Sequence, residues 1–199
     1  MSPFLYPARP YTRRHGPHGY ADYASYRPWL RDEFGFKCVY CLNREQWGRV
    51  RGTFDLDHFL PIKFRPELAG TYEYLVYSCA ACNDAKRDAV IPDPCQVLVS
   101  GDVTVREDGT LETRTPDARR IVRVLGLDDR EATEFRRLWI EIVAMAGRSD
   151  PQLYRRLMGY PDELPDLHRL RPPGGNTRPE GVVESCLAKR RNGTLPESY

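Results

Sequence analysis

The sequence predicts an α+β fold whose centre is held together by a zinc ion, and three observations lead to this prediction. Two Cys-x-x-Cys pairs, Cys38/Cys41 and Cys79/Cys82, have 37 residues between them, which matches the spacing of a structural zinc site. Short segments of alternating apolar and polar residues around these pairs indicate strands. Segments with apolar residues at helical spacing indicate helices, most of them after the second pair.

Length and composition limit the domain organisation and the class of protein. The chain of 199 residues suits one domain with appendages, or two small ones. Lys and Arg total 30 against 28 Asp and Glu, so nucleic-acid binding would need local clusters of basic residues. No apolar run could span a bilayer, and no signal-peptide core is present at the N-terminus. We therefore expect a cytoplasmic protein without membrane contact, in which paired cysteines bind metal rather than form disulfides.

Residues 1–20 are interpreted as a basic, proline-rich arm. This segment contains four Pro, three Arg and no acidic residue, so it buries little surface and is expected to be extended. Aromatic residues are interleaved with the arginines. That pattern suits a segment lying on nucleic acid, and it suits a segment packed across the protein's own surface equally well.

Residues 21–95 are expected to form the central domain, which includes both cysteine pairs. Its first element is a helix over 21–34, because apolar side chains recur there at helical spacing. Gly35 ends this helix and leads into a tight knuckle that carries Cys38 and Cys41. Three further elements are expected in chain order: a hairpin over 47–60 that is broken at Gly52 and ends at Asp57–His58, a short strand over 74–77, and a helix from near Cys79 to Lys86 or Arg87.

Residues 96–160 are expected to form a β-hairpin followed by helices. Thr115 is a suitable N-cap for the first helix, because Pro116 follows at the first helical position. The expected elements are strands over 97–99 and 103–105 and helices over 115–125, 128–146 and 150–157. Residues 161–199 are rich in Pro, Gly and Arg and are expected to form a tail with a weak helical segment over 182–189.

A candidate reactive site lies between the two cysteine pairs. Closing both pairs on one ion folds the chain back, which brings Asp57 and His58 near Asn83. A carboxylate and an amide oxygen suit Mg²⁺ or Mn²⁺, and a neutral imidazole accepts a proton from water near pH 7. Because a four-thiolate zinc has no open position for chemistry, we expect any reaction to occur at these three residues.

The motifs together resemble the HNH nuclease family in its zinc-containing form. Their order is C-x-x-C, then D-H-F-L-P, then Y-L-V-Y-S-C-x-x-C-N-x-x-K, over roughly a quarter of the chain. The resemblance implies a ββα-metal core that hydrolyses phosphodiester bonds in DNA. It also implies that Asp57 and Asn83 hold Mg²⁺ or Mn²⁺ and that His58 is the general base. Tyr74 stands where the family usually has an Asn that orients this histidine, so the Tyr74 hydroxyl or the backbone would have to replace it.

The resemblance also suggests contacts and partners. The basic residues near the motif, which are candidates for phosphate contact, are Lys63, Arg65, Lys86 and Arg87. Similar stand-alone proteins often act in anti-phage defence or restriction, which implies DNA, or RNA, as substrate and a partner protein that supplies targeting or activation. Two other functions stay open at this point: a zinc ribbon that binds nucleic acid without catalysis, and a ribonuclease or toxin-like nuclease with its own immunity partner.

Overall fold

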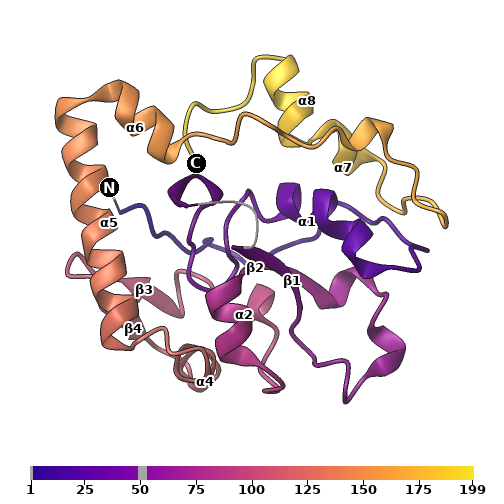
Figure 1. Cartoon of the computed structure of the whole chain (residues 1–199), viewed down its shortest axis with the longest axis horizontal. Coiled ribbons are helices and arrows are strands. Elements are labelled where there is room, and N and C mark those ends of the chain that lie inside the picture. The colour runs from indigo at the N-terminus through magenta and orange to yellow at the C-terminus, as the bar shows by residue number, and fades with distance from the viewer. Residues whose placement is uncertain (1, 49–52) are drawn as a thin grey trace.

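The computed structural model describes residues 2–48 and 53–199 (Figure 1). Two antiparallel strands, β1 (Phe54–His58) and β2 (Leu75–Cys79), lie near the centre of the molecule. Helix α1 (Arg27–Glu33) packs against β2, and helix α2 (Ala80–Lys86) packs against both strands. The predicted α+β class is therefore confirmed.

The register of the two strands determines what lies at each end of the pair. Phe54 is opposite Cys79, and His58 is opposite Leu75. The start of β1 therefore lies beside the second cysteine pair, while His58 lies at the far end. Helix α2 begins directly after β2 and carries Lys86 back to the His58 end, where its ammonium reaches the His58 backbone oxygen at 2.8 Å.

The second strand of the hairpin predicted over 47–60 ends at His58 as expected, and most of its first strand lies outside the described residues. Strand β1 pairs with β2 across a loop that contains the short 3₁₀ helices η3 (Pro66–Leu68) and η4 (Tyr72–Tyr74). Residues 45–47 form another 3₁₀ helix, η2 (Glu45–Trp47), rather than a strand. The predicted break at Gly52 lies outside the described residues. Alternation along one segment predicts a strand but does not identify its partner, which depends on tertiary packing.

The N-terminal arm packs across the protein's own surface, which was one of its two expected roles. Phe4 and Tyr6 are buried in the core, and the Tyr6 hydroxyl donates to the Tyr40 backbone oxygen at 2.6 Å. Arg13 donates to the backbone oxygen of Leu75 at 2.6 Å, at the start of β2. Hydrogen bonds from Tyr6 and Arg13 therefore hold the arm against Tyr40 and β2.

The C-terminal segment interlocks with this arm. Pro17 and Asn176 form an isolated antiparallel bridge, and the backbone nitrogen of His18 donates to the Gly175 oxygen at 3.1 Å. The backbone nitrogen of Cys186 donates to the Asp32 carboxylate at 2.7 Å. The segment expected as a tail is thus packed against both the arm and the helical region around α1.

The remaining elements agree with the sequence prediction in most places. The side chain of Thr115 caps the first helix as expected, accepting from the backbone of Ala118. The strand predicted over 97–99 is wrong, because Asp93 caps a short helix that starts at Pro94. The elements are η1 (Tyr23–Tyr26), α3 (Pro94–Val97), β3 (Val103–Val105), β4 (Leu111–Thr113), α4 (Pro116–Val124), α5 (Arg130–Ser149), α6 (Pro151–Met158), η5 (Leu167–Arg169), α7 (Glu180–Val183) and α8 (Cys186–Arg191). Within the described ranges, no helix has both the length and the apolar character to cross a membrane.

Candidate four-cysteine centre and the Asp57–His58 site

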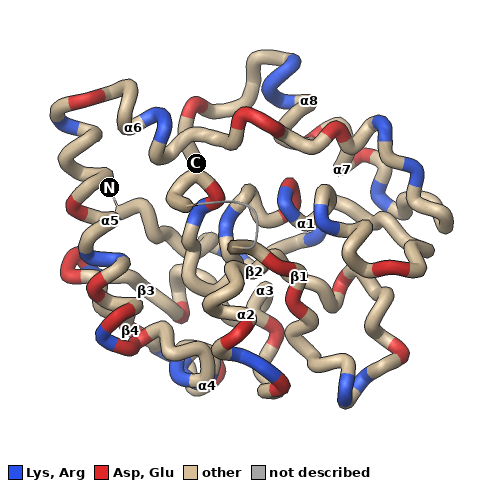
Figure 2. The backbone as a smooth tube through the Cα atoms, in the orientation of Figure 1, with Lys and Arg blue, Asp and Glu red and all other residues tan. Residues whose placement is uncertain are grey.

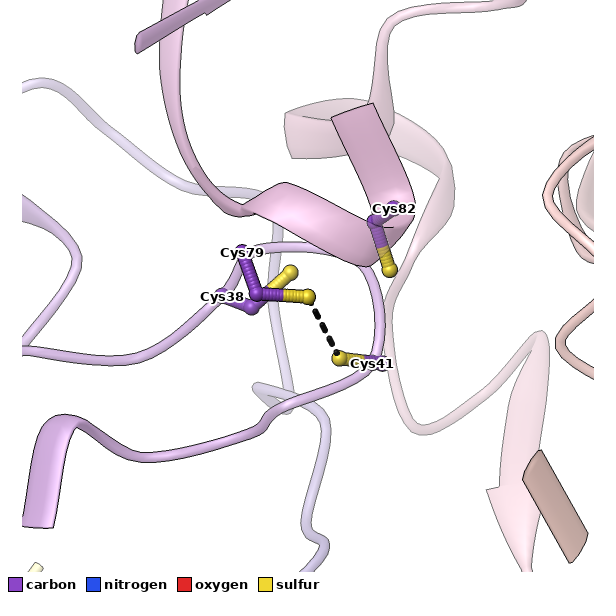
Figure 3. Close-up of side chains that lie close together, drawn as sticks. All are labelled: Cys38, Cys41, Cys79 and Cys82. Carbon is purple, nitrogen blue, oxygen red and sulfur yellow. Dashed lines mark hydrogen bonds between the residues drawn. The ribbon is translucent and has the colours of Figure 1, made fainter. Parts of the chain in front are cut away.

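Four cysteine side chains meet beside the strand pair (Figure 3). Cys38 and Cys41 come from the knuckle after α1, Cys79 ends β2, and Cys82 lies in the first turn of α2. Their sulfur atoms all lie within 4.8 Å of one another, and the sulfurs of Cys41 and Cys79 are 3.6 Å apart. A tetrahedral zinc with bonds of about 2.3 Å would hold its sulfurs about 3.8 Å apart. The predicted cluster is confirmed, and its donor set and spacing fit a structural zinc.

Local backbone geometry forms the knuckle that carries the first pair. The backbone nitrogen of Cys38 donates to the Asn43 oxygen at 2.9 Å, and that of Leu42 donates to the Cys38 oxygen at 3.0 Å. Leu42 adopts a positive φ of 62°, which costs a non-glycine residue about 1 kcal/mol or more. The buried Leu42 side chain offsets this cost, and a hydrogen bond from Val39 to the Tyr77 oxygen holds the knuckle on β2.

The thiols of the cluster have strongly shifted pKa values. Burial raises the pKa of Cys38, but hydrogen bonds from the other three sulfurs lower it, and the result lies well below its usual range. Hydrogen bonds to Cys38 are the main reason that the pKa values of Cys41 and Cys82 lie well above theirs. Because zinc binds thiolates, its binding releases the protons that such thiols hold. Zinc affinity at this cluster therefore falls as the pH falls.

Asp57 lies inside the protein, where each of its two carboxylate oxygens has a hydrogen-bond partner. Its side chain accepts a hydrogen bond from the Lys86 ammonium at 2.9 Å through Oδ1 and from the Tyr40 hydroxyl at 2.5 Å through Oδ2. Burial, followed by the Asp57 charge, raises the pKa of Tyr40 well above its usual range, so the phenol stays protonated and donates. Asp57 and Lys86 thus form a buried ion pair in which both charges have partners.

The burial of Lys86 differs from the prediction that it contacts phosphate. The residue is 2 % exposed, and its ammonium also donates to the His58 backbone oxygen at 2.8 Å. A lysine at the C-terminal end of a short helix is usually exposed, and here the carboxylate on the neighbouring strand draws it inward. Lys86 is therefore part of the interior and not of the surface available to a ligand.

His58 is held by the backbone of the loop between the strands. Its Nε2 lies 2.8 Å from the carbonyl oxygen of Ala69. Because a carbonyl only accepts, Nε2 carries the proton, and Nδ1 of the neutral ring is left as an acceptor. The Tyr23 ring meets the imidazole edge-on, with 4.8 Å between ring centroids. Of the two expected partners for this ring, the Tyr74 hydroxyl and the backbone, the backbone of Ala69 is the one that contacts it, and the Tyr74 ring stacks on Phe59.

Among the described residues, the other predicted ones form no hydrogen bond or ion pair with Asp57 or His58, and most of them are exposed. Asn83 is partly buried and lies three residues before Lys86 on α2, so the two side chains are neighbours on one face of the helix. Lys63 and Arg65 are exposed in the loop, where they pair with Asp88 and Glu67 respectively. Arg87 is exposed at the end of α2. These three basic side chains remain at the surface, in contrast to Lys86.

Sequence reasoning missed Tyr40 and Ala69 as partners of the site. Tyr40 lies inside the first Cys-x-x-Cys motif, which was a signal that its side chain would be close to the motif's neighbours. Ala69 offers only its backbone oxygen to His58, and no side-chain pattern can reveal such a contact.

No protein-family model matches this chain, and no curated protein matches it significantly.

Proposed function

We propose that this protein is a metal-dependent endonuclease of the HNH type that hydrolyses phosphodiester bonds in DNA. The observation that supports this most directly is the position of His58 at the end of β1, with Nε2 bonded to the Ala69 oxygen. A general base must be held in one tautomer and orientation. With Nε2 as donor, Nδ1 is the nitrogen that takes the proton of an attacking water.

Asp57 and Asn83 would supply the donors for a divalent ion. The Asp57 carboxylate and the Asn83 amide oxygen are hard ligands of the kind that Mg²⁺ and Mn²⁺ take, together with water and phosphate oxygens. Each Asp57 oxygen keeps a second lone pair beyond the hydrogen bond that it accepts. When bound, the ion would stabilise the leaving 3′ oxygen and the charge on phosphorus. The four-cysteine cluster would hold zinc and keep β2 and α2 in place beneath these residues.

Lys86 imposes a condition on this proposal. Its ammonium is 2.9 Å from Oδ1 of Asp57, so it already supplies the positive charge that the carboxylate needs. A divalent ion at Asp57 has to compete with this lysine or share the carboxylate with it. The proposal therefore requires Asp57 to bind a divalent ion more tightly when Lys86 is replaced by an uncharged side chain.

The cellular role that fits such a nuclease is an effector in anti-phage defence or restriction, with a partner protein that supplies targeting or activation. Basic and acidic residues are interspersed along the chain (Figure 2), and the net charge is only +2. Affinity for nucleic acid depends strongly on clustered positive charge. A partner would supply the affinity for nucleic acid that this charge distribution does not provide.

Cleavage of supercoiled plasmid with Mg²⁺ or Mn²⁺ tests the proposal. The native chain should nick or linearise the plasmid, His58→Ala should be inactive, and His168→Ala, which alters an exposed histidine in η5, should match the native chain. Removal of one general base typically lowers the rate about 10²–10⁴-fold. Equal cleavage by His58→Ala would refute the assignment of the base. Parallel single-stranded DNA and RNA substrates identify a ribonuclease or toxin-like enzyme.

The ion pair of Asp57 with Lys86 favours a second candidate, a zinc ribbon that binds nucleic acid without catalysis. Titration of Mn²⁺ into the native chain and Lys86→Met separates the two, with the rise in melting temperature as the readout. The nuclease proposal expects a larger rise in Lys86→Met, because the competing ammonium is gone. The zinc-ribbon candidate expects no rise in either protein and no cleavage of any substrate.

A further inference from the structure

The first cysteine knuckle brings two cationic side chains together. Lys37 and Arg44 are partners in an isolated antiparallel β-bridge, and residues directly opposite each other in such a bridge project to the same side. Like charges in this arrangement repel each other. The neighbouring Glu45 cannot neutralise them, because its carboxylate accepts hydrogen bonds from Arg31 and Tyr77.

Arg44 is buried with two of its three guanidinium nitrogens unpaired among the described residues. The residue is 2 % exposed, and its Nε and Nη1 atoms are enclosed with no hydrogen-bond partner among the described residues. Its guanidinium carbon lies 4.3 Å from the ring centroid of Tyr199 and 5.6 Å from that of Trp47. Stacking of this kind uses the faces of the guanidinium and provides no acceptor for the N–H groups of Nε and Nη1, which lie in its plane.

A cavity of about 170 Å³ lies where these two cations meet. Its polar lining consists of Ser2, Lys37, Arg44, Ser198 and the rings of Tyr154 and Tyr199. Among the described residues that line it, none is an Asp or a Glu, and no ion pair of the described residues includes Lys37 or Arg44. Tyr154 and Met158 of α6 line the cavity, and both chain ends lie near α6 in Figure 1.

The donors around this cavity suit a tetrahedral anion. The Arg44 fork provides directed N–H groups, Lys37 provides an ammonium, and two serine hydroxyls add neutral donors. A planar carboxylate uses one such fork, whereas a phosphate has oxygens that point in several directions at once. An anion here would also relieve the repulsion between the two cations and satisfy the buried Arg44 nitrogens.

We propose that this cavity binds a phosphate group, from either a nucleic-acid strand or a free nucleotide. This proposal does not depend on His58 or on any cleavage reaction. It applies equally if the protein is a nuclease and if it is a binding module.

Calorimetric titration of the zinc-loaded full chain tests the proposal with inorganic phosphate, AMP and a short DNA oligonucleotide as probes. The native chain should bind at least one of them. Lys37→Gln and Arg44→Met should weaken that binding at least about tenfold, since each removes a charged partner of a buried anion. Arg156→Gln is the matched control, because Arg156 is an exposed cation on α6 that does not line the cavity.

The probes and variants distinguish the outcomes. Binding of the oligonucleotide that inorganic phosphate displaces identifies a strand phosphate, and binding of AMP alone identifies a nucleotide. Zinc content and melting temperature, measured for each variant, show whether the fold is intact. If Arg44→Met fails to fold, Lys37→Gln still tests the proposal. Lys37 is only partly buried, so its replacement disturbs the fold less. Absence of binding to all three probes at millimolar concentration, or equal binding by native chain and folded Lys37→Gln, overturns the proposal.

Discussion

Two pairs of charged side chains in the molecule differ in how their charges are neutralised. In the first pair, Lys86 and Asp57 lie 2.9 Å apart, and the Tyr40 hydroxyl donates to the other oxygen of the carboxylate. In the second pair, Lys37 and Arg44 are both cationic, and two Arg44 nitrogens have no partner among the described residues. A buried charge costs several kcal/mol unless it is paired. The charges of the first pair therefore neutralise each other, whereas the charges of the second pair are neutralised only when an anion binds.

The largest expected effect comes from the cluster that both regions share. Cys79→Ala should abolish zinc binding and unfold the knuckle together with α2, because binding of a structural zinc contributes about 10 kcal/mol or more to folding. Zinc content by mass spectrometry and far-UV circular dichroism would measure both losses. Cys95→Ala is the control, since Cys95 is equally buried but lies outside the cluster. Retention of zinc by Cys79→Ala would show that the four sulfurs do not form one site.

The next prediction contrasts the two charge pairs directly. Lys86→Met leaves the Asp57 carboxylate buried without its cation, and this should cost about 3–5 kcal/mol in the free energy of unfolding. Arg44→Met removes a charge that has no carboxylate partner among the described residues, so it should cost much less or stabilise the chain. Urea unfolding of the zinc-loaded proteins measures both.

A double variant sharpens this contrast. Asp57→Asn combined with Lys86→Met replaces both charges, so it should recover most of the stability that each single variant loses. If Arg44→Met loses as much stability as Lys86→Met, then Arg44 has a structural partner, and the difference between the two regions disappears.

Local features of this molecule could be predicted from its sequence, and long-range contacts largely could not. Cysteine spacing and the Thr115 cap are local signals, and the structure confirms both. The pairing of β1 with β2 was implied only by the family resemblance, and the burial of Lys86 had no signal in the sequence, because both depend on contacts between segments that are distant in the chain. The Arg44 cavity had no sequence signal at all, because it forms only when both ends of the chain pack against the knuckle.

Another buried charge, Asp32 on α1, allows the stability of buried charges to be compared as the pH changes. Asp32 is fully buried, and it accepts from His15 at 2.9 Å and from the Cys186 backbone at 2.7 Å. Burial raises the pKa of Asp32, but the His15 hydrogen bond and the Arg14 charge lower it more, and the net shift is downward. A carboxylate with a lowered folded-state pKa adds stability above its unfolded value of about 3.9, and this stability is lost as the pH falls through the folded value.

Asp32→Asn should therefore be less stable than the native chain at pH 7, and this difference should shrink as the pH falls below about 4. Urea unfolding of both proteins from pH 7 down to 3 would measure the difference. Acid also protonates the thiolates of the zinc cluster, but it does so in both proteins, so subtraction isolates the contribution of Asp32. A difference that stays constant over this range would mean that the charge of Asp32 is not what its partners stabilise, and that its contacts act only as neutral hydrogen bonds.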